Sequence, residues 1–228
     1  MEMKFQLSQP ELEYLIMLTH SDETLKYQKG SGPKEGRAAV SHKSLIEKGY
    51  IQEEENQQPQ VLVSLMTLMQ SILICDAAFC AVEVQKDGKR QSFGFYFYEG
   101  RIAFAEQKGQ QYDLIEVPSL PLAAGMLANR IEIKRESAEI INEIVLDEAA
   151  KDLGLGTEWG QAERQWTLIG KNRKDKKAQW MMTVMESSDD QTMVELRTGR
   201  ITVSRPGKTD FFNACMSWMQ KAHAAVRG

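Results

Sequence analysis

The sequence repeats one order of predicted elements, and this repeat limits the possible folds more than any single motif. From residue 61 onward, each half contains an amphipathic or apolar helix, four short strands and a closing helix. The strands and closing helix begin at residues 79, 91, 101, 112 and 120 in the first half, and at 165, 178, 192, 200 and 208 in the second. The offset is therefore 86 to 91 residues. Residue identity between the halves is low, so only the pattern repeats.

The first half, residues 61–131, reads as a helix followed by a four-stranded antiparallel meander. An Asp87-Gly88 step between two alternating segments is a strong signal for a tight β-hairpin. Ser119, just after Pro118, is a typical N-cap for the closing helix. The predicted elements are a helix at 61–75, strands at 79–86, 91–98, 101–106 and 112–117, and a helix at 120–130.

The second half, residues 136–228, is predicted to follow the same order. Its elements are a helix at 136–152, strands at 165–170, 178–186, 192–197 and 200–204, and a helix at 208–226. The predicted fold class is α+β, with two pseudo-symmetric halves that each form an antiparallel meander with flanking helices. We expect both helices of each half to cover one sheet face, and the two halves to share one core.

Residues 1–57 form an N-terminal helical unit in this interpretation. Ser8, Pro10 and Glu11 open a helix as N-cap, first-turn proline and capping-box acid, and Gly49 closes a second helix at 41–48. Two helices followed by a short extended segment are similar to a winged helix. A DNA-binding transcriptional regulator with a C-terminal sensing domain is therefore an alternative function, with Ser41 to Ser44 facing base edges and Lys48 near a phosphate.

Charge opposes the DNA-binding alternative. The chain has 28 Lys and Arg against 32 Asp and Glu, a formal net charge of −4 at pH 7. Glu53, Glu54 and Glu55 place three negative charges where a wing would meet the phosphate backbone. The main prediction is accordingly that the protein does not bind nucleic acid.

No set of residues assembles an enzyme or a metal site. His20, His42 and His223 are the three histidines, and none has a second ligand-type residue at metal-binding spacing. Cys75, Cys80 and Cys215 lack a C-x-x-C spacing and are interpreted as small apolar residues. The sequence therefore predicts no catalysis, no cofactor and no metal.

The most apolar segment, residues 61–82, contains Ser64, Thr67, Gln70, Ser71 and Asp76 and lacks flanking basic clusters. It is therefore predicted as a core helix and a strand, without insertion into a membrane. A start without a leader pattern, together with three cysteines, predicts a reduced protein of the cytoplasm.

Aromatic and methionine residues concentrate on two equivalent strands, at 91–98 and 178–186. Two interpretations remain open: a sheet that is buried on both sides, or an exposed apolar surface that accepts a helical partner, which the 12 methionines of the chain would suit. Under the second interpretation, the candidate partner-binding residues are Phe95, Phe97, Trp180, Met182 and Met185.

The order of elements resembles the EspG/EsaE-type chaperones of bacterial type VII secretion systems. The resemblance covers nearly the whole chain, from the helix at Leu7 to Leu18 and the segment Leu45-Ile46-Glu47-Lys48-Gly49-Tyr50-Ile51 to the two halves with closing helices. It implies a cytosolic, non-catalytic protein without a cofactor. Such a protein binds secreted helical-hairpin substrates of the WXG, PE/PPE or LXG type and keeps them soluble before export.

Overall fold

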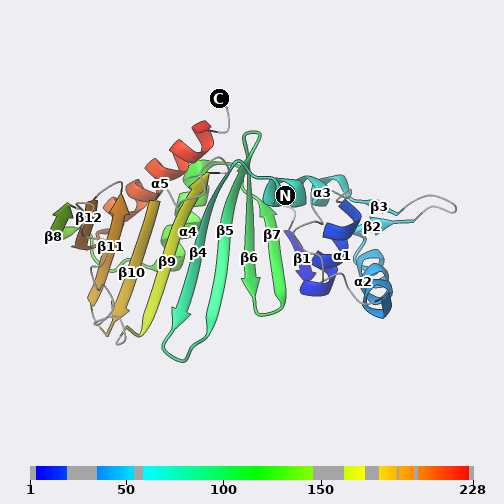
Figure 1. Ribbon diagram of the computed structural model, residues 1–228, viewed down its shortest axis with the longest axis horizontal. Helices are drawn as coiled ribbons and strands as arrows, with labels where there is room; N and C mark the ends of the chain where they lie inside the picture. Colours follow the sequence, from blue (N-terminus) through cyan, green and yellow to red (C-terminus); the bar gives the residue numbers. More distant parts are fainter. Residues whose placement is uncertain are drawn as a thin grey trace.

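The computed structural model contains one large antiparallel sheet with helices on both of its faces (Figure 1). It describes residues 4–19, 35–53, 59–145, 162–172, 180–188, 190–197 and 200–225. The helices are α1 (Gln9–Thr19), α2 (Glu35–Glu47), α3 (Val63–Leu73), α4 (Leu120–Ile131) and α5 (Lys208–Ala225). The predicted α+β class with antiparallel meanders is confirmed.

The ten strands of the sheet lie in the order β1-β7-β6-β5-β4-β9-β10-β11-β12-β8. Their bounds are β1 (Lys4–Ser8), β4 (Ala77–Gln85), β5 (Arg90–Tyr98), β6 (Arg101–Lys108), β7 (Gln111–Glu116), β8 (Glu139–Val145), β9 (Arg164–Asn172), β10 (Trp180–Ser187), β11 (Asp190–Arg197) and β12 (Arg200–Arg205). A separate two-stranded sheet pairs β2 (Ile51–Gln52) with β3 (Gln60–Val61). The strand predictions from residue 79 onward are met within a few residues.

The strand order is symmetric about the junction of β4 and β9. Each of these strands starts one meander, and the two pair antiparallel from Ala77↔Asn172 to Gln85↔Arg164. At the outer ends, β1 adds to β7 of the first meander and β8 adds to β12 of the second. The repeat in the sequence therefore appears as two meanders joined into one continuous sheet.

One face of the sheet forms a core with α4 and α5. Side chains alternate between faces along each strand, so Phe79, Phe95 and Leu168 all point to this side, and each is buried. The helices contribute buried residues such as Leu127 of α4 and Trp218 of α5 to the same cluster. Ser119 caps α4 by accepting from the Leu122 N–H at 3.4 Å, as predicted.

Within the described ranges, α1 and α3 cover the opposite face over β1, β7, β6 and part of β5, and α2 packs against α1. Phe5, Leu7 and Leu114 of the sheet pack there with Leu15 of α1 and Leu65 of α3. The predicted capping box at the start of α1 is present: Glu11 N–H donates to Ser8 Oγ, and Ser8 N–H donates to Glu11 Oε2 at 2.6 Å. Gly49, at φ +70°, ends α2 as expected.

Two expectations are corrected. Helix α3 lies on the opposite face of the sheet from α4, because its buried residues join Leu114 and Ala103 while those of α4 join Phe95 and Phe104. The two helices of the first half therefore do not share a face.

The predicted helix at 136–152 is a strand over Glu139–Val145, and residues 146–152 lie outside the described residues. The sequence Glu-Ile-Ile-Asn-Glu-Ile-Val is rich in β-branched residues, which favour strands, and β12 offers an edge for pairing.

Candidate partner-binding surface

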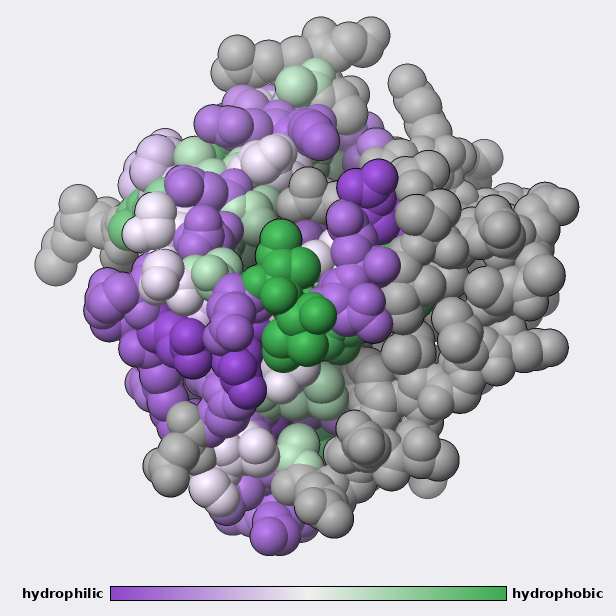
Figure 2. Space-filling view, turned by 90° about the vertical axis from the view of Figure 1, so that its left-hand side faces the viewer, coloured by the Kyte–Doolittle hydropathy of each residue, from purple (hydrophilic) through white to green (hydrophobic). Residues whose placement is uncertain are grey.

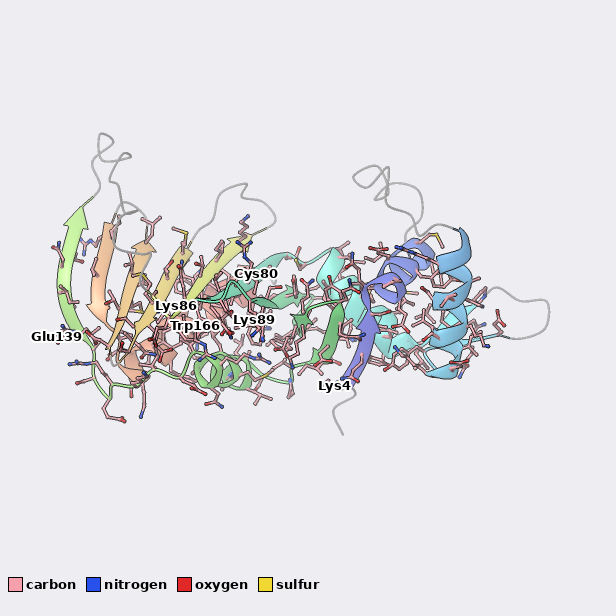
Figure 3. All side chains as sticks on the ribbon, turned by 90° about the horizontal axis from the view of Figure 1, so that it is seen from below. Lys4, Cys80, Lys86, Lys89, Glu139 and Trp166 are labelled. Atoms are coloured by element: carbon pink, nitrogen blue, oxygen red, sulfur yellow. The ribbon has the colours of Figure 1, made fainter. Side chains whose placement is uncertain are left out.

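The second meander leaves one face of the sheet without a covering helix among the residues that the structure describes. We call this surface the open face and define it by three cross-strand rows on the side opposite α4 and α5. The rows are Val82–Thr167–Thr183–Val194, Cys80–Ile169–Met181–Leu196 and Val84–Gln165–Met185–Thr192. Figure 3 views the sheet from below and labels Cys80 and Trp166, which belong by register to opposite faces.

Apolar side chains dominate the open face. Val82 and Met181 are more than one-third exposed, while Ile169 and Met185 are half-buried. Burial raises the pKa of the Cys80 thiol despite a hydrogen bond with Tyr96, so this side chain is uncharged at neutral pH. The aliphatic and thioether groups that dominate this surface suit an apolar partner.

Four of the five predicted partner-binding residues lie in the core and not on the open face. Phe95, Phe97 and Met182 have no exposed surface, and Trp180 is nearly as buried. They point toward α4 and α5, since each joins the cluster built around those helices. A role for these four in partner binding stays a prediction, and it would have to act through the strands that they hold in place.

The fifth predicted residue, Met185, lies on the open face, opposite Gln165 and Thr192. Its neighbour Met181 lies on the same face but was not among the candidates. Alternation along residues 180–187 is the sequence signal that distinguishes core residues from open-face residues in β10. Trp180, Met182 and Val184 face the core, while Met181 and Met185 face away from it.

On the core side, aromatic contacts connect the strands of the open face to α5. The Trp180 Nε1 proton is donated to Glu195 Oε1 at 2.6 Å, and the Trp180 ring stacks on that of Trp218 at 6.0 Å. Phe79 of β4 contacts both indoles, at 5.4 Å from Trp180 and 5.2 Å from Trp218. Strands from both meanders are therefore fixed to α5 beneath the open face.

Two of the candidate DNA-contacting residues in the N-terminal unit, His42 and Lys48, make contacts within the chain. His42 lies between the Tyr14 hydroxyl, at 2.8 Å from Nδ1, and Glu53 Oε1, at 2.5 Å from Nε2. Lys48 donates to Glu11 at 2.8 Å and to the Gln6 carbonyl oxygen at 3.1 Å. These pairings, together with Glu53 on the adjoining segment, disfavour phosphate binding by α2.

Within the described ranges, no group of three or more His, Cys, Asp or Glu residues is arranged to hold a metal ion. Among the described helices, none is both long and apolar enough to cross a membrane.

The arrangement of one ten-stranded antiparallel sheet, paired meanders and flanking helices is the EspG-type fold, as the element order predicted. The chain is similar to a solved structure of the Mycobacterium tuberculosis type VII secretion system chaperone EspG5 in complex with a PE25–PPE41 dimer. The TM-score is 0.68, the sequence identity is 9%, and the alignment covers 96% of each chain. No family model and no curated protein matches the sequence, so the likeness is one of fold.

Proposed function

We propose that this protein is a non-catalytic chaperone or adaptor that binds helical substrate proteins of a bacterial type VII secretion system and keeps them soluble for export. The observation that carries the proposal is the EspG-type fold over 96% of both chains. At 9% identity this likeness gives a shared architecture, and the assignment of function is our inference.

The open face provides the physical basis for binding. A helical hairpin that exposes an apolar surface before export would aggregate in water unless that surface is covered. Burying that surface against Val82, Ile169, Met181 and Met185 would be driven by the hydrophobic effect. The flexible thioether groups of the two methionines would adapt to partners of differing shape.

The proposed partners are secreted helical-hairpin proteins of the PE/PPE, WXG or LXG type. The EspG5 structure contains a PE25–PPE41 dimer, which makes the PE/PPE class the first to test. We further propose that binding takes place in the cytoplasm, before export, and needs no cofactor and no catalysis.

Co-expression tests the proposal directly. Each PE/PPE-, WXG- or LXG-type protein encoded in the same genome would be expressed alone and with the full chain, and its soluble fraction measured. At least one should be soluble only with the chain and should elute with it through size exclusion. If none gains solubility or co-elutes, and substrate screening instead reveals turnover, the proposed function is wrong.

A further inference from the structure

The two edge strands of the sheet occupy equivalent places in the two halves, yet among the residues that the structure describes only the β1 edge is closed by side chains. At β1, the Gln6 N–H donates to the Tyr50 hydroxyl at 3.2 Å, and Lys48 Nζ donates to the Gln6 carbonyl oxygen at 3.1 Å. The Ser8 N–H donates to Glu11 Oε2 at 2.6 Å. These side chains therefore form hydrogen bonds with backbone N–H and C=O groups on the outer edge of β1, which another strand would need for pairing.

At β8, within the described part of the chain, β12 is the only strand that pairs, and no side chain bonds the outer backbone edge. Ile140 is 70% exposed and Ile141 is 51% exposed, so the edge is also apolar. Figure 2 looks onto this end of the sheet and shows a compact hydrophobic spot with hydrophilic residues to its left and right. Unpaired backbone groups beside exposed isoleucines are the features of a strand that accepts another strand.

The acidic residues of β8 do not oppose such pairing, because arginines of the same chain neutralise them. Glu139, labelled in Figure 3, lies 3.1 Å from Arg205 and 3.3 Å from Arg135. Glu143 lies 2.8 Å from Arg200. An incoming strand therefore meets paired charges at this edge.

We propose that β8 pairs antiparallel with β8 of a second copy of this chain, which would extend the sheet across a two-fold axis. The strand is compatible with itself in this arrangement. An axis at Asn142 sets Glu143 of one copy opposite Ile141 of the other and Glu139 opposite residue 145, so no carboxylate faces another.

The closed β1 edge determines where such growth stops. A sheet with two free edges would add copies into a filament, whereas capping of β1 by Tyr50, Lys48 and Glu11 leaves only the β8 edge available. The assembly is therefore a closed dimer.

A β-bulge between Val203 and Ser204 interrupts the β12–β8 register, and bulges weaken edge pairing. The seven residues of β8 also form a small interface. Both features make the dimer weak and dependent on concentration. It does not rest on the proposed function, since it forms without substrate.

Sedimentation velocity of the full chain over a concentration series tests the dimer. The mass should rise from 25.9 kDa toward twice that value as concentration increases. An Ile140→Lys/Asn142→Lys double variant should raise the dissociation constant at least about tenfold, because the ammonium groups introduced at position 142 of the two copies would face each other at the two-fold axis and the exposed apolar surface of Ile140 would be lost. Val40→Lys, at an equally exposed position on α2, should dimerise like the wild type.

Hydrogen exchange provides an independent readout that does not need a variant. The amides of β8 should exchange more slowly as the wild-type concentration rises, while those of β1 stay unchanged. A wild type that remains at 25.9 kDa throughout, or a double variant that dimerises like Val40→Lys, overturns the proposal. Protection of β8 that appears only when a co-expressed substrate is added also overturns it, and would assign the edge to a partner strand.

Discussion

The indole of Trp218 occupies the space where a side chain at Gly170 would begin. A Cβ atom placed on Gly170 would lie 2.0 Å from Trp218 Cζ2 and 2.1 Å from Cε2. Trp218 cannot retreat easily, because it stacks on Trp180 and packs against Phe79. The absence of a side chain at Gly170 of β9 therefore lets α5 approach the junction of the two meanders.

Gly170→Ala should destabilise the protein by about 1–3 kcal/mol, since overpacking a well-filled core displaces side chains and backbone. Gly125→Ala in α4 is the matched control, because a Cβ there meets nothing within 4 Å. That change should be neutral or stabilise by up to about 1 kcal/mol through helix propensity. Urea denaturation of both variants measures the two values, and equal destabilisation would contradict the account.

Met182→Ala should mainly lower folding stability and Met181→Ala should mainly weaken partner binding, because the two residues face opposite sides of β10. Met182 has no exposed surface, so its truncation should cost about 2–5 kcal/mol of folding free energy. Met181 is 36% exposed, so its truncation should change folding free energy by less than about 1 kcal/mol while weakening partner binding. Denaturation and binding assays on the pair check both statements. Loss of binding with Met182→Ala at full stability would place the site elsewhere.

The buried carboxylate of Glu11 should make the N-terminal unit sensitive to acid. Burial alone raises the pKa of Glu11, but hydrogen bonds from Lys48, the Ser8 N–H and Ser44 together lower it below its ordinary value. The stabilisation is therefore complete above the ordinary pKa of an unfolded glutamate and is lost as pH falls through the lowered value in the folded state.

Glu11→Gln should thus cost about 1.5–3 kcal/mol at pH 7, the typical loss of hydrogen bonds to a charged group. The difference from the wild type should shrink as the pH approaches the lowered pKa of Glu11 and vanish below it. Stability curves at several pH values test this, with the exposed Glu47→Gln as control. A difference that stays constant into the acid range would show that the charge of Glu11 does not matter.

The two halves should unfold together. We propose that residues 61–131 and 136–228 share one core, because β4 and β9 pair along their whole lengths and Phe79 contacts two indoles of the second half. Backbone and tryptophan signals should therefore give coincident denaturation curves. Phe79→Ala should shift both curves together by about 3–5 kcal/mol. Two separated transitions for these halves would contradict a shared core.

The division from the N-terminal unit, residues 1–57, stays a prediction.

Much of the sheet could be predicted from local signals. The Asp87-Gly88 turn, the cap at Ser119 and the alternating strands define β4 to β7 and α4 within the first half. Strand β8 could not be predicted, because isoleucines at 140, 141 and 144 fit a helical spacing as well as a strand. Pairing with β12, a long-range contact, decides between them.

The candidate site was harder to predict than the fold, because residue type does not reveal which sheet face a helix covers. The phenylalanines of β5 and the methionines of β10 are suitable both for a core and for a binding surface. Alternation separates Met181 from Met182, but only the position of α5 against β4, β5 and β9 shows that the Met182 side is the buried one.

The most direct test of the account is the affinity of open-face variants for a substrate obtained by co-expression. Met181→Lys and Val82→Lys place charges on the open face, while Leu122→Lys places one on the exposed side of α4 as a matched control. Each variant would be checked for native stability and then titrated with the purified substrate. We predict at least about a tenfold loss of affinity for the two open-face variants and wild-type affinity for Leu122→Lys. Unchanged affinity in both open-face variants, or loss of affinity with Leu122→Lys, would contradict binding at the open face.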